Sequence, residues 1–298
     1  MDRKYFLQNS LLAFGAVTLG KQSIVKAMAV DPWKITMLTK DIGIFTERGG
    51  TIAFHFSKDG ITVVDAQFPD TAQHLINELK KKNDQAFHLL INTHHHGDHT
   101  SGNIAFKDLL KRVLAHENSL ANQQKVAATT KTEDKQLYPN QTFGKVWEER
   151  SGKERISLNY FGPGHTNGDA IIHFEHANIV HMGDLVFNRR HPFVDRSAGA
   201  NINSWMNVLN AAMNKFDNKT VFVCGHSGND FEVKGKKEML LAFHDYLGNV
   251  LNFVGNEIKA GKTKEEILKA TQIPGSPEWK TDGIERPLAA AFEELSAG

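Results

Sequence analysis

The sequence predicts an α/β protein with one large domain, and three observations support that class. Short apolar or alternating runs, such as Thr51–Phe56 and Phe87–Ile91, predict strands. Between them, Asp70–Lys82 has apolar residues at helical spacing and a basic last turn. The chain has 298 residues, of which 40% are hydrophobic and 23% charged. That composition is ordinary for a globular protein.

The first third of the chain after residue 30 predicts a sheet followed by a helix and one more strand. Asp59-Gly60 is a hairpin signal between two strand-like runs. The helix is Asp70–Lys82, and the apolar run that follows it predicts a buried strand. The expected strands are Lys34–Leu38, Ile42–Phe45, Thr51–Phe56, Ile61–Val64 and Phe87–Ile91.

The rest of the chain predicts a polar helical stretch, more strands and a helical end. Residues from about 114 to 155 look helical and polar. We see no linker and no short-period repeat, so residues 30–298 are expected to form one domain with a helical extension from about residue 236. The expected strands are Ile156–Tyr160, Ala170–Phe174, Asn178–His181 and Thr220–Cys224, and the expected helices are 203–216, 236–260, 264–270 and 287–295.

The first 29 residues have the three parts of a secretory signal peptide: a basic start, an apolar centre at 11–19 and a small-x-small end at 27–29. Arg3-Lys4-x-Phe6-Leu7 also resembles a twin-arginine export signal, with Lys4 in the place of the second arginine. The apolar run is short for a permanent membrane anchor. We therefore expect a periplasmic or secreted protein without an anchor in its mature form; the alternative is an amphipathic helix packed on the domain.

Charge and cysteine content exclude some classes of function. The chain has 35 Lys+Arg against 34 Asp+Glu, so no broad basic field favours nucleic acid or an anionic membrane. The single cysteine, Cys224, excludes an intramolecular disulfide and a Cys-rich zinc module. A small-molecule substrate is the expected partner; the oligomeric state is left open.

The strongest motif is His94-x-His96-x-Asp98-His99, directly after a predicted buried strand. Imidazole nitrogen and carboxylate oxygen are the ligands of catalytic zinc. Alternate residues of an extended segment point to the same side, so His94 and His96 can converge on one ion while His95 points elsewhere. Asp98 and His99 follow where the chain turns and can reach a second ion. The alternative is a fortuitous histidine-rich loop.

Three further candidate ligands share a local context. His165, Asp184 and His226 each follow or end an apolar strand, and each comes directly after a glycine. Glycine permits a sharp turn and a close approach of the backbone to metals. One such histidine alone is more often structural, but three at strand ends predict a shared site.

These motifs, in this order, resemble the metallo-β-lactamase superfamily, from about Lys34 to His226. The resemblance includes the strand end at Val63-Val64-Asp65. It implies a four-layer αβ/βα sandwich, with two mixed β-sheets flanked by helices and metals at one edge. It also implies two zinc ions; the residues do not exclude iron or manganese. One ion would be held by His94, His96 and His165, the other by Asp98, His99 and His226, with Asp184 bridging.

The chemistry expected of such a pair is hydrolysis. Two zinc ions about 3.5–4 Å apart would share a water, which becomes a hydroxide near neutral pH and attacks a carbonyl carbon. Asp98 would orient this nucleophile and carry its proton to the leaving group. Asp65 would accept the free N–H of a ligand imidazole, unless it is only a strand-terminal turn residue.

Other residues near the motifs are candidates for the substrate mouth. Arg189 and Arg190 could pair with a substrate carboxylate, the alternative being a solvated loop. His116 and His191 could line the cleft. Cys224, in an apolar strand, is expected to be an inert core thiol.

The expected function is therefore a metal-dependent hydrolase acting on a lactone or β-lactam. The best-known β-lactamases of the superfamily have cysteine or serine where this chain has Asp184; an aspartate resembles the glyoxalase II and lactonase branches. Thioester or phosphodiester hydrolysis is an alternative. An iron-dependent oxidoreductase is another, although nothing after His226 resembles a flavodoxin-like module. A binding protein on a decayed scaffold would not keep all seven ligand positions filled.

Overall fold

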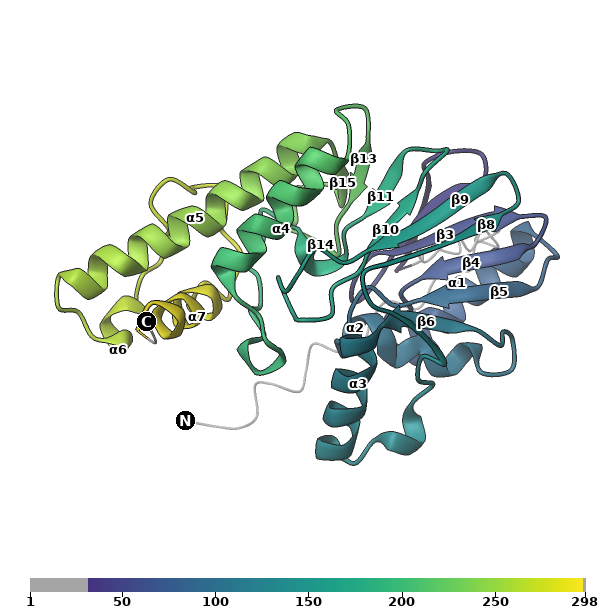
Figure 1. Ribbon diagram of the computed structural model, residues 1–298, viewed down its shortest axis with the longest axis horizontal. Helices are drawn as coiled ribbons and strands as arrows, with labels where there is room; N and C mark the ends of the chain where they lie inside the picture. Colours follow the sequence, from purple (N-terminus) through teal and green to yellow (C-terminus); the bar gives the residue numbers. More distant parts are fainter. Residues whose placement is uncertain (1–31, 297–298) are drawn as a thin grey trace, which may run out of the picture. The chain divides into compact units, whose positions relative to one another are not determined.

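The computed structural model describes residues 32–296, so the predicted signal peptide lies outside the described residues. Within that range two large β-sheets face each other and helices cover their outer faces, giving the expected four layers (Figure 1). No helix of this part of the chain is both long and apolar enough to span a bilayer.

The first sheet has seven strands in sequence order. β1 to β4 are antiparallel, and β4 to β7 are parallel. Ser57 pairs with Gly60 across the predicted Asp-Gly turn, where Gly60 has φ 122°, a value that favours glycine. The strands are β1 Lys34–Met37, β2 Ile42–Thr46, β3 Ile52–Ser57, β4 Gly60–Val64, β5 Phe87–Ile91, β6 Val113–His116 and β7 Gln141–Phe143.

The second sheet has six strands in the order β15-β13-β11-β10-β9-β8. The expected hairpin is β10 with β11, and β11 pairs in parallel with β13. A separate short ribbon joins β12 Phe187–Asn188 to β14 His226–Ser227. The strands are β8 Val146–Ser151, β9 Glu154–Asn159, β10 Ile171–Phe174, β11 Ile179–His181, β13 Val221–Val223 and β15 Lys234–Gly235.

The expectation of a helical stretch over 114–155 is wrong in most of its length. Only α3, Glu117–Thr130, is an α-helix there; β6, β7 and β8 take up much of the remainder. β8 lies at the edge of its sheet, and its residues alternate between exposed and half-buried until Ser151. An edge strand with one solvated face is polar in composition, so it lacks the apolar run that marks a central strand.

Side-chain alternation assigns each strand residue to one of the layers. In β4, Val63 packs toward α1 (Pro69–Lys82), while Val64 faces the other sheet. The helix presents Ala72, Leu75, Ile76 and Leu79 to that core, as its spacing predicts.

The outer face of the second sheet is covered by the C-terminal helices. Ile171 packs toward Trp205 and Phe243, while its neighbour Ile172 faces the first sheet. The helical extension predicted from the sequence is therefore part of a hydrophobic core. The remaining helices are α2 Gly97–Thr100, α4 Ile202–Lys215, α5 Lys237–Lys259, α6 Lys264–Ile267 and α7 Glu285–Ser296.

Candidate metal centre

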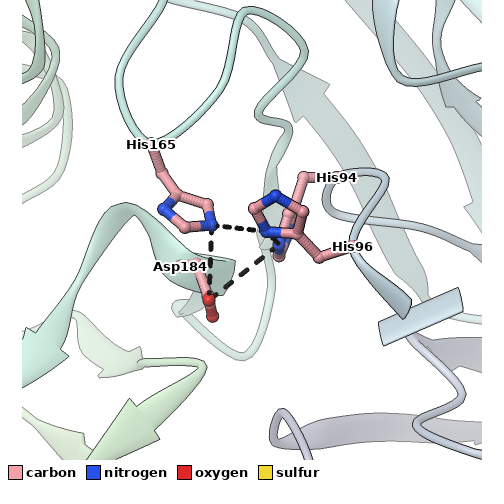
Figure 2. A group of neighbouring side chains, drawn as sticks. All are labelled: His94, His96, His165 and Asp184. Atoms are coloured by element: carbon pink, nitrogen blue, oxygen red, sulfur yellow. Dashed lines mark hydrogen bonds and ion pairs between the residues drawn. The ribbon is translucent and has the colours of Figure 1, made fainter. Parts of the chain in front are cut away.

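All seven predicted ligands lie together, on loops that follow strands of both sheets. The loop after β5 and the short helix α2 supply four of them. His165 comes from the loop between β9 and β10, Asp184 from the turn after β11, and His226 from β14. Figure 2 shows His94, His96, His165 and Asp184 pointing toward one another from these separate segments.

Three histidine nitrogens form the first group. His96 Nδ1 lies 3.1 Å from His94 Nε2 and 2.8 Å from His165 Nε2. The carboxylate of Asp184 faces them, with its Oδ2 atom 3.5 Å from His165 Nε2 and 3.9 Å from His94 Nε2. These four donor atoms lie within 4.8 Å of one another.

Asp98, His99 and His226 form the second group on the other side of Asp184. His226 Nε2 lies 3.0 Å from Asp98 Oδ2 and 3.4 Å from Asp184 Oδ2. His99 Nε2 lies 3.1 Å from the other oxygen of Asp184, Oδ1. The Oδ2 atom of Asp184 thus faces histidines of both groups, whereas its Oδ1 atom faces His99 of the second group.

The outer nitrogens of the first-group imidazoles are occupied by hydrogen bonds. His165 Nδ1 donates to the Phe193 carbonyl at 2.8 Å, and His96 Nε2 donates to Asp195 at 2.9 Å. His94 Nδ1 lies 3.0 Å from the Thr93 hydroxyl. A neutral imidazole has only one N–H. The inner nitrogens of these rings are therefore lone pairs directed at one another.

Asp65 supports ligands of both groups. Its Oδ2 atom accepts from His99 Nδ1 at 2.7 Å and from the Thr93 hydroxyl at 2.8 Å. Because Thr93 gives its proton to Asp65, its oxygen is free to accept from His94. Asp65 is fully buried and adopts φ 65°, a left-handed conformation that aspartate tolerates.

Asp195 has a comparable position that the sequence analysis missed. Besides His96, its Oδ2 atom lies 3.4 Å from His95 Nε2, while its Oδ1 atom accepts from the Ser197 hydroxyl. Burial raises the pKa of Asp195, but the hydrogen bonds from His95 and His96 outweigh it and hold that pKa far below its usual range. His95 lies outside both groups described above, and with His96 and Asp195 it forms a third set of donor atoms that lie within 4.8 Å of one another.

At two positions of the site, neighbouring atoms leave no room for a Cβ, so only glycine fits. A Cβ on Gly225 would lie 1.9 Å from Asp184 Oδ1, and one on Gly183 would lie 2.7 Å from Thr93 Cβ. Gly183 also has φ 51°. The glycines that precede Asp184 and His226 therefore allow the close approach that the sequence pattern predicts.

Burial and charge set different protonation tendencies in the two groups. Burial lowers the pKa of His94 well below its usual value and that of His165 to about 3. Burial also acts on His226, but the carboxylates of Asp184 and Asp98 prevail and raise its pKa to about 9. The carboxylates raise the pKa of His99 in the same way.

The residues fit a metal. His99 Nε2 and Asp184 Oδ1 are both buried and face each other at 3.1 Å, but neither makes a well-aligned hydrogen bond. Buried polar atoms without partners are rare in native proteins, and an ion is one standard explanation. The lone pairs of the first group point inward without a proton between them, which a cation would compensate. Nitrogen and carboxylate oxygen donors suit zinc, and iron or manganese also accept them.

The structure places the predicted substrate residues in different surroundings. Arg189 bonds Glu278 and lies over the ring of Trp279. His191 is buried, and its Nδ1 atom lies 2.7 Å from the Tyr246 hydroxyl. Neither lines the polar pocket beside His226.

His116, the third substrate candidate, is buried at the end of β6. Its ring packs on the tilted ring of Tyr160, and its Nδ1 atom caps α3 by accepting from the Asn118 amide. Arg190 does line the pocket of about 290 Å³ beside His226, together with Lys34.

Phe193 is a second feature of the site that the sequence analysis did not single out. Its side chain is 47% exposed, although its ring lies 5.6 Å from that of His96 and 6.4 Å from that of His165. It belongs to the loop after Asp184 and places an exposed apolar surface next to the first group. Cys224 is buried, and burial raises the pKa of its thiol to about 12, consistent with an inert residue.

The sandwich and the histidine–aspartate clusters at one edge of it define a metallo-hydrolase. The family model of the metallo-beta-lactamase superfamily matches residues 51–226. The chain belongs to this superfamily.

The relatives and solved structures agree with this assignment. Metallo-beta-lactamase type 2 of Bacillus cereus is 24% identical over 204 residues, covering 64% of this chain and 75% of the relative. Metallo-beta-lactamase IND-1 of Chryseobacterium indologenes is 23% identical over 193 residues, covering 63% of this chain and 76% of the relative.

Among solved structures, a metallo-beta-lactamase from Pontibacter korlensis has a TM-score of 0.62 at 18% identity, covering 73% of this chain and 99% of its own. A double mutant of the sec-alkyl sulfatase PisA1 has a TM-score of 0.70 at 13% identity, covering 88% of this chain and half of its own. At these identities the likeness concerns the fold.

Proposed function

We propose that this chain is a binuclear zinc hydrolase that cleaves a cyclic amide or ester in a small substrate, such as a β-lactam or a lactone. The observation that supports this most is the convergence of the His94, His96 and His165 ring nitrogens with the Asp184 carboxylate. A second group faces that carboxylate from the other side. Two groups around one shared carboxylate would suit two ions, and Asp184 would be a ligand of both.

The protein residues have distinct tasks in this mechanism. Zinc in such a site makes a hydroxide available near neutral pH and stabilises the developing oxyanion. The side chain of Asp98 is 33% exposed, more than that of any of the other six candidate ligands. Its Oδ2 atom lies 3.0 Å from His226 Nε2. Its histidine neighbours outweigh burial and lower its pKa to about 2. As a carboxylate at neutral pH, Asp98 would accept the nucleophile's proton and pass it to the leaving group.

Two surfaces beside the site would contact the substrate. Arg190 and Lys34, in the pocket next to His226, offer positive charge for a substrate carboxylate. Phe193 offers an apolar wall beside His96. Arg189, which is bound to Glu278, is assigned a structural task in this proposal.

The test combines metal analysis with two substrate panels. Purified protein is analysed by mass spectrometry for metal and then assayed with nitrocefin and with homoserine lactones. We expect about two zinc ions per chain and hydrolysis in one panel, with loss of turnover in Asp98→Asn. Silence on both panels with zinc bound would refute the lactam–lactone version, and thioester and phosphodiester substrates would be tested next.

The same metal analysis also tests the oxidoreductase alternative. Two iron ions per chain would overturn the zinc assignment and favour oxygen or nitric oxide chemistry. We also propose that residues 1–29 direct export and are removed. N-terminal sequencing of protein from the periplasm or medium should then begin after Ala29, and intact Met1 there would contradict cleavage.

A further inference from the structure

A second cavity lies at the edge of the sandwich opposite the candidate metal centre. Its volume is about 710 Å³, and turns of both sheets line it. Gln85 of its lining precedes β5, whereas His94 follows the other end of that strand. Glu154 of its lining begins β9, and His165 follows the other end of β9 in the same way. None of the seven candidate ligands lines this cavity, so it is separate from the site described above.

His55 lies at the inner end of this cavity, between the two sheets. Because alternate residues of a strand share a face, it turns toward the second sheet as Ala53 does, and its ring centroid lies 6.0 Å from that of Phe174. Its Nε2 atom has no hydrogen-bond partner among the described residues, yet it is not one of the unpartnered atoms that are closed to solvent. Since the sheets enclose the rest of the ring, Nε2 opens onto the cavity that His55 lines.

A chain of hydroxyl groups determines which nitrogen of His55 carries the proton. The Ser57 hydroxyl donates to the Gly60 carbonyl, and the Ser151 hydroxyl donates to Ser57 Oγ, each at 3.0 Å. Ser151 Oγ is therefore left to accept from His55 Nδ1, which lies 3.4 Å away. Burial lowers the pKa of His55, although the carboxylates of Glu154 and Asp41 oppose this effect. A neutral imidazole has one N–H, so Nε2 is an acceptor.

Glu154 places a buried negative charge in the same wall. Its carboxylate accepts from the backbone amides of Arg155 and His176 through Oε1 and from that of Ala177 through Oε2. It forms no ion pair with any side chain of residues 32–296. Buried charges are usually paired, so this wall lacks a positive group.

Three lysines give the outer part of the lining the opposite charge. Lys40, Lys58 and Lys153 come from three different turns and are exposed. Within the described part of the chain none of them forms a hydrogen bond or ion pair through its ammonium group. Asp41 is the one exposed carboxylate among the lining residues. The buried groups of the cavity thus favour a positive donor, and the exposed groups favour an anion.

We propose that this cavity binds a small zwitterion, whose ammonium group donates to His55 Nε2 beside Glu154 and whose carboxylate lies among the three lysines. Ile42, Phe56 and Ala177 of the lining offer apolar surface to the body between the two charges. A ligand with a positive charge alone would be repelled by the lysines, and one with a negative charge alone by Glu154. The proposal concerns binding and does not depend on the hydrolase reaction.

The test is a titration of the purified, metal-loaded protein with ε-aminocaproate, followed by protein NMR. This zwitterion has an apolar body and no bond that a hydrolase would cleave. Caproate lacks its ammonium group, and hexylamine lacks its carboxylate. We expect saturable shifts of resonances in the lining turns at millimolar concentration, and about tenfold weaker binding of either analogue. Absence of such shifts, or equal binding of one analogue, would refute the proposal.

Two variants locate the ligand. His55→Phe removes the acceptor, so ε-aminocaproate should bind about tenfold more weakly, the loss expected for one charge-assisted hydrogen bond. Replacing Lys40, Lys58 and Lys153 together by Gln should weaken binding several-fold without affecting the fold, because all three are exposed. Unchanged binding in this triple variant would overturn the assignment, even if His55→Phe fails to fold. The matched control, in which binding should not change, replaces three exposed lysines outside the lining by Gln: Lys131, Lys145 and Lys280.

Discussion

Single hydrogen bonds decide which nitrogen of each imidazole faces the metal centre. Asp65, Asp195 and the Phe193 carbonyl each accept the outer N–H of a different histidine. Partners of this kind fix the ring orientation and raise the basicity of the inner nitrogen. Asp65 has the widest effect, because it bonds His99 directly and supports His94 through Thr93.

The substitution Asp65→Asn should weaken metal binding about 10- to 100-fold. Asparagine also tolerates the left-handed backbone, so the change removes the charge and one acceptor rather than the fold. Affinity is measured by competition with a chromogenic chelator. Asp59→Asn is the control: its carboxylate accepts from the Gly152 amide and contacts none of the ligands. Equal affinities in the two variants would contradict the role given to Asp65.

The substitution Gly225→Ala should abolish or severely reduce metal loading, since its Cβ would occupy the position of an Asp184 oxygen. Mass spectrometry of the purified variant measures the bound metal. Gly255→Ala, inside α5, is the matched control because its Cβ would make only an ordinary contact at 3.6 Å. Full metal content in Gly225→Ala would show that Asp184 does not need its observed position.

At the scale of residues, the sequence predicted the seven candidate ligands but missed Asp195, because Asp195 is marked by no local pattern. The motif residues from His94 to His99 are close in the chain, and glycines mark the other three ligands, so local patterns place them. Asp195 contacts His96 across 99 residues and lies in an irregular loop. A contact between residues so far apart in the chain leaves no periodic pattern in the sequence. The loop's charged and aromatic residues, Arg189 to Asp195, are the only signal.

At the scale of elements, the sequence predicted most strands with apolar runs and missed the polar β7 and β8, together with the short buried β6, which fell inside the predicted helical stretch. β13 is a central strand of apolar residues and β5 is one with His88 as its single polar residue, whereas β8 is an edge strand with a solvated face. One cluster joins this edge strand to the first sheet. Arg112, just before β6, makes two hydrogen bonds to Glu149 of β8, at 2.9 and 2.6 Å, and one to Gln141 of β7.

The Arg112–Glu149 pair should contribute about 1 kcal/mol at pH 7, a modest value because both side chains are nearly one-third exposed. Its hydrogen bonds lower the pKa of Glu149. The contribution is therefore present above the unfolded pKa, about 4.3, and lost as pH falls through the lower folded value.

Denaturant unfolding of Arg112→Met measures this contribution. The variant should be less stable than the parent at pH 7, and the difference should shrink below about pH 4 as Glu149 is protonated. Arg155→Met, which removes the exposed pairs with Glu148 and Glu175, is the control and should change stability much less than Arg112→Met does. A difference that grows in acid would contradict the sign of the shift.

At the scale of the whole domain, the metal centre joins its two halves. Four candidate ligands follow β5 of the first sheet, while His165, Asp184 and His226 follow strands β9, β11 and β13 of the second. An ion held by both sets binds the folded chain and not the unfolded one, so it stabilises the fold by mass action.

Removing the metal with a chelator should lower the melting temperature. At metal concentrations about 1,000-fold above Kd the stabilisation is about 4 kcal/mol, which corresponds to roughly 8–16 °C for a domain of this size. Differential scanning calorimetry with and without chelator measures it. Asp184→Ala should show no chelator-dependent shift. An unchanged melting temperature after verified metal loss would mean that the ions do not join the two sheets.

The loop that carries Phe193 and Asp195 is hydrogen-bonded to the C-terminal part of the chain. Arg189 bonds Glu278, the His191 amide donates to Thr281, and the His191 ring meets Tyr246 of α5. Residues 278–281 thus contact the loop beside the candidate metal centre, and they lie outside the region that the family model covers. Exchanging that distant segment between homologues should alter which molecules are accepted while leaving every metal ligand untouched.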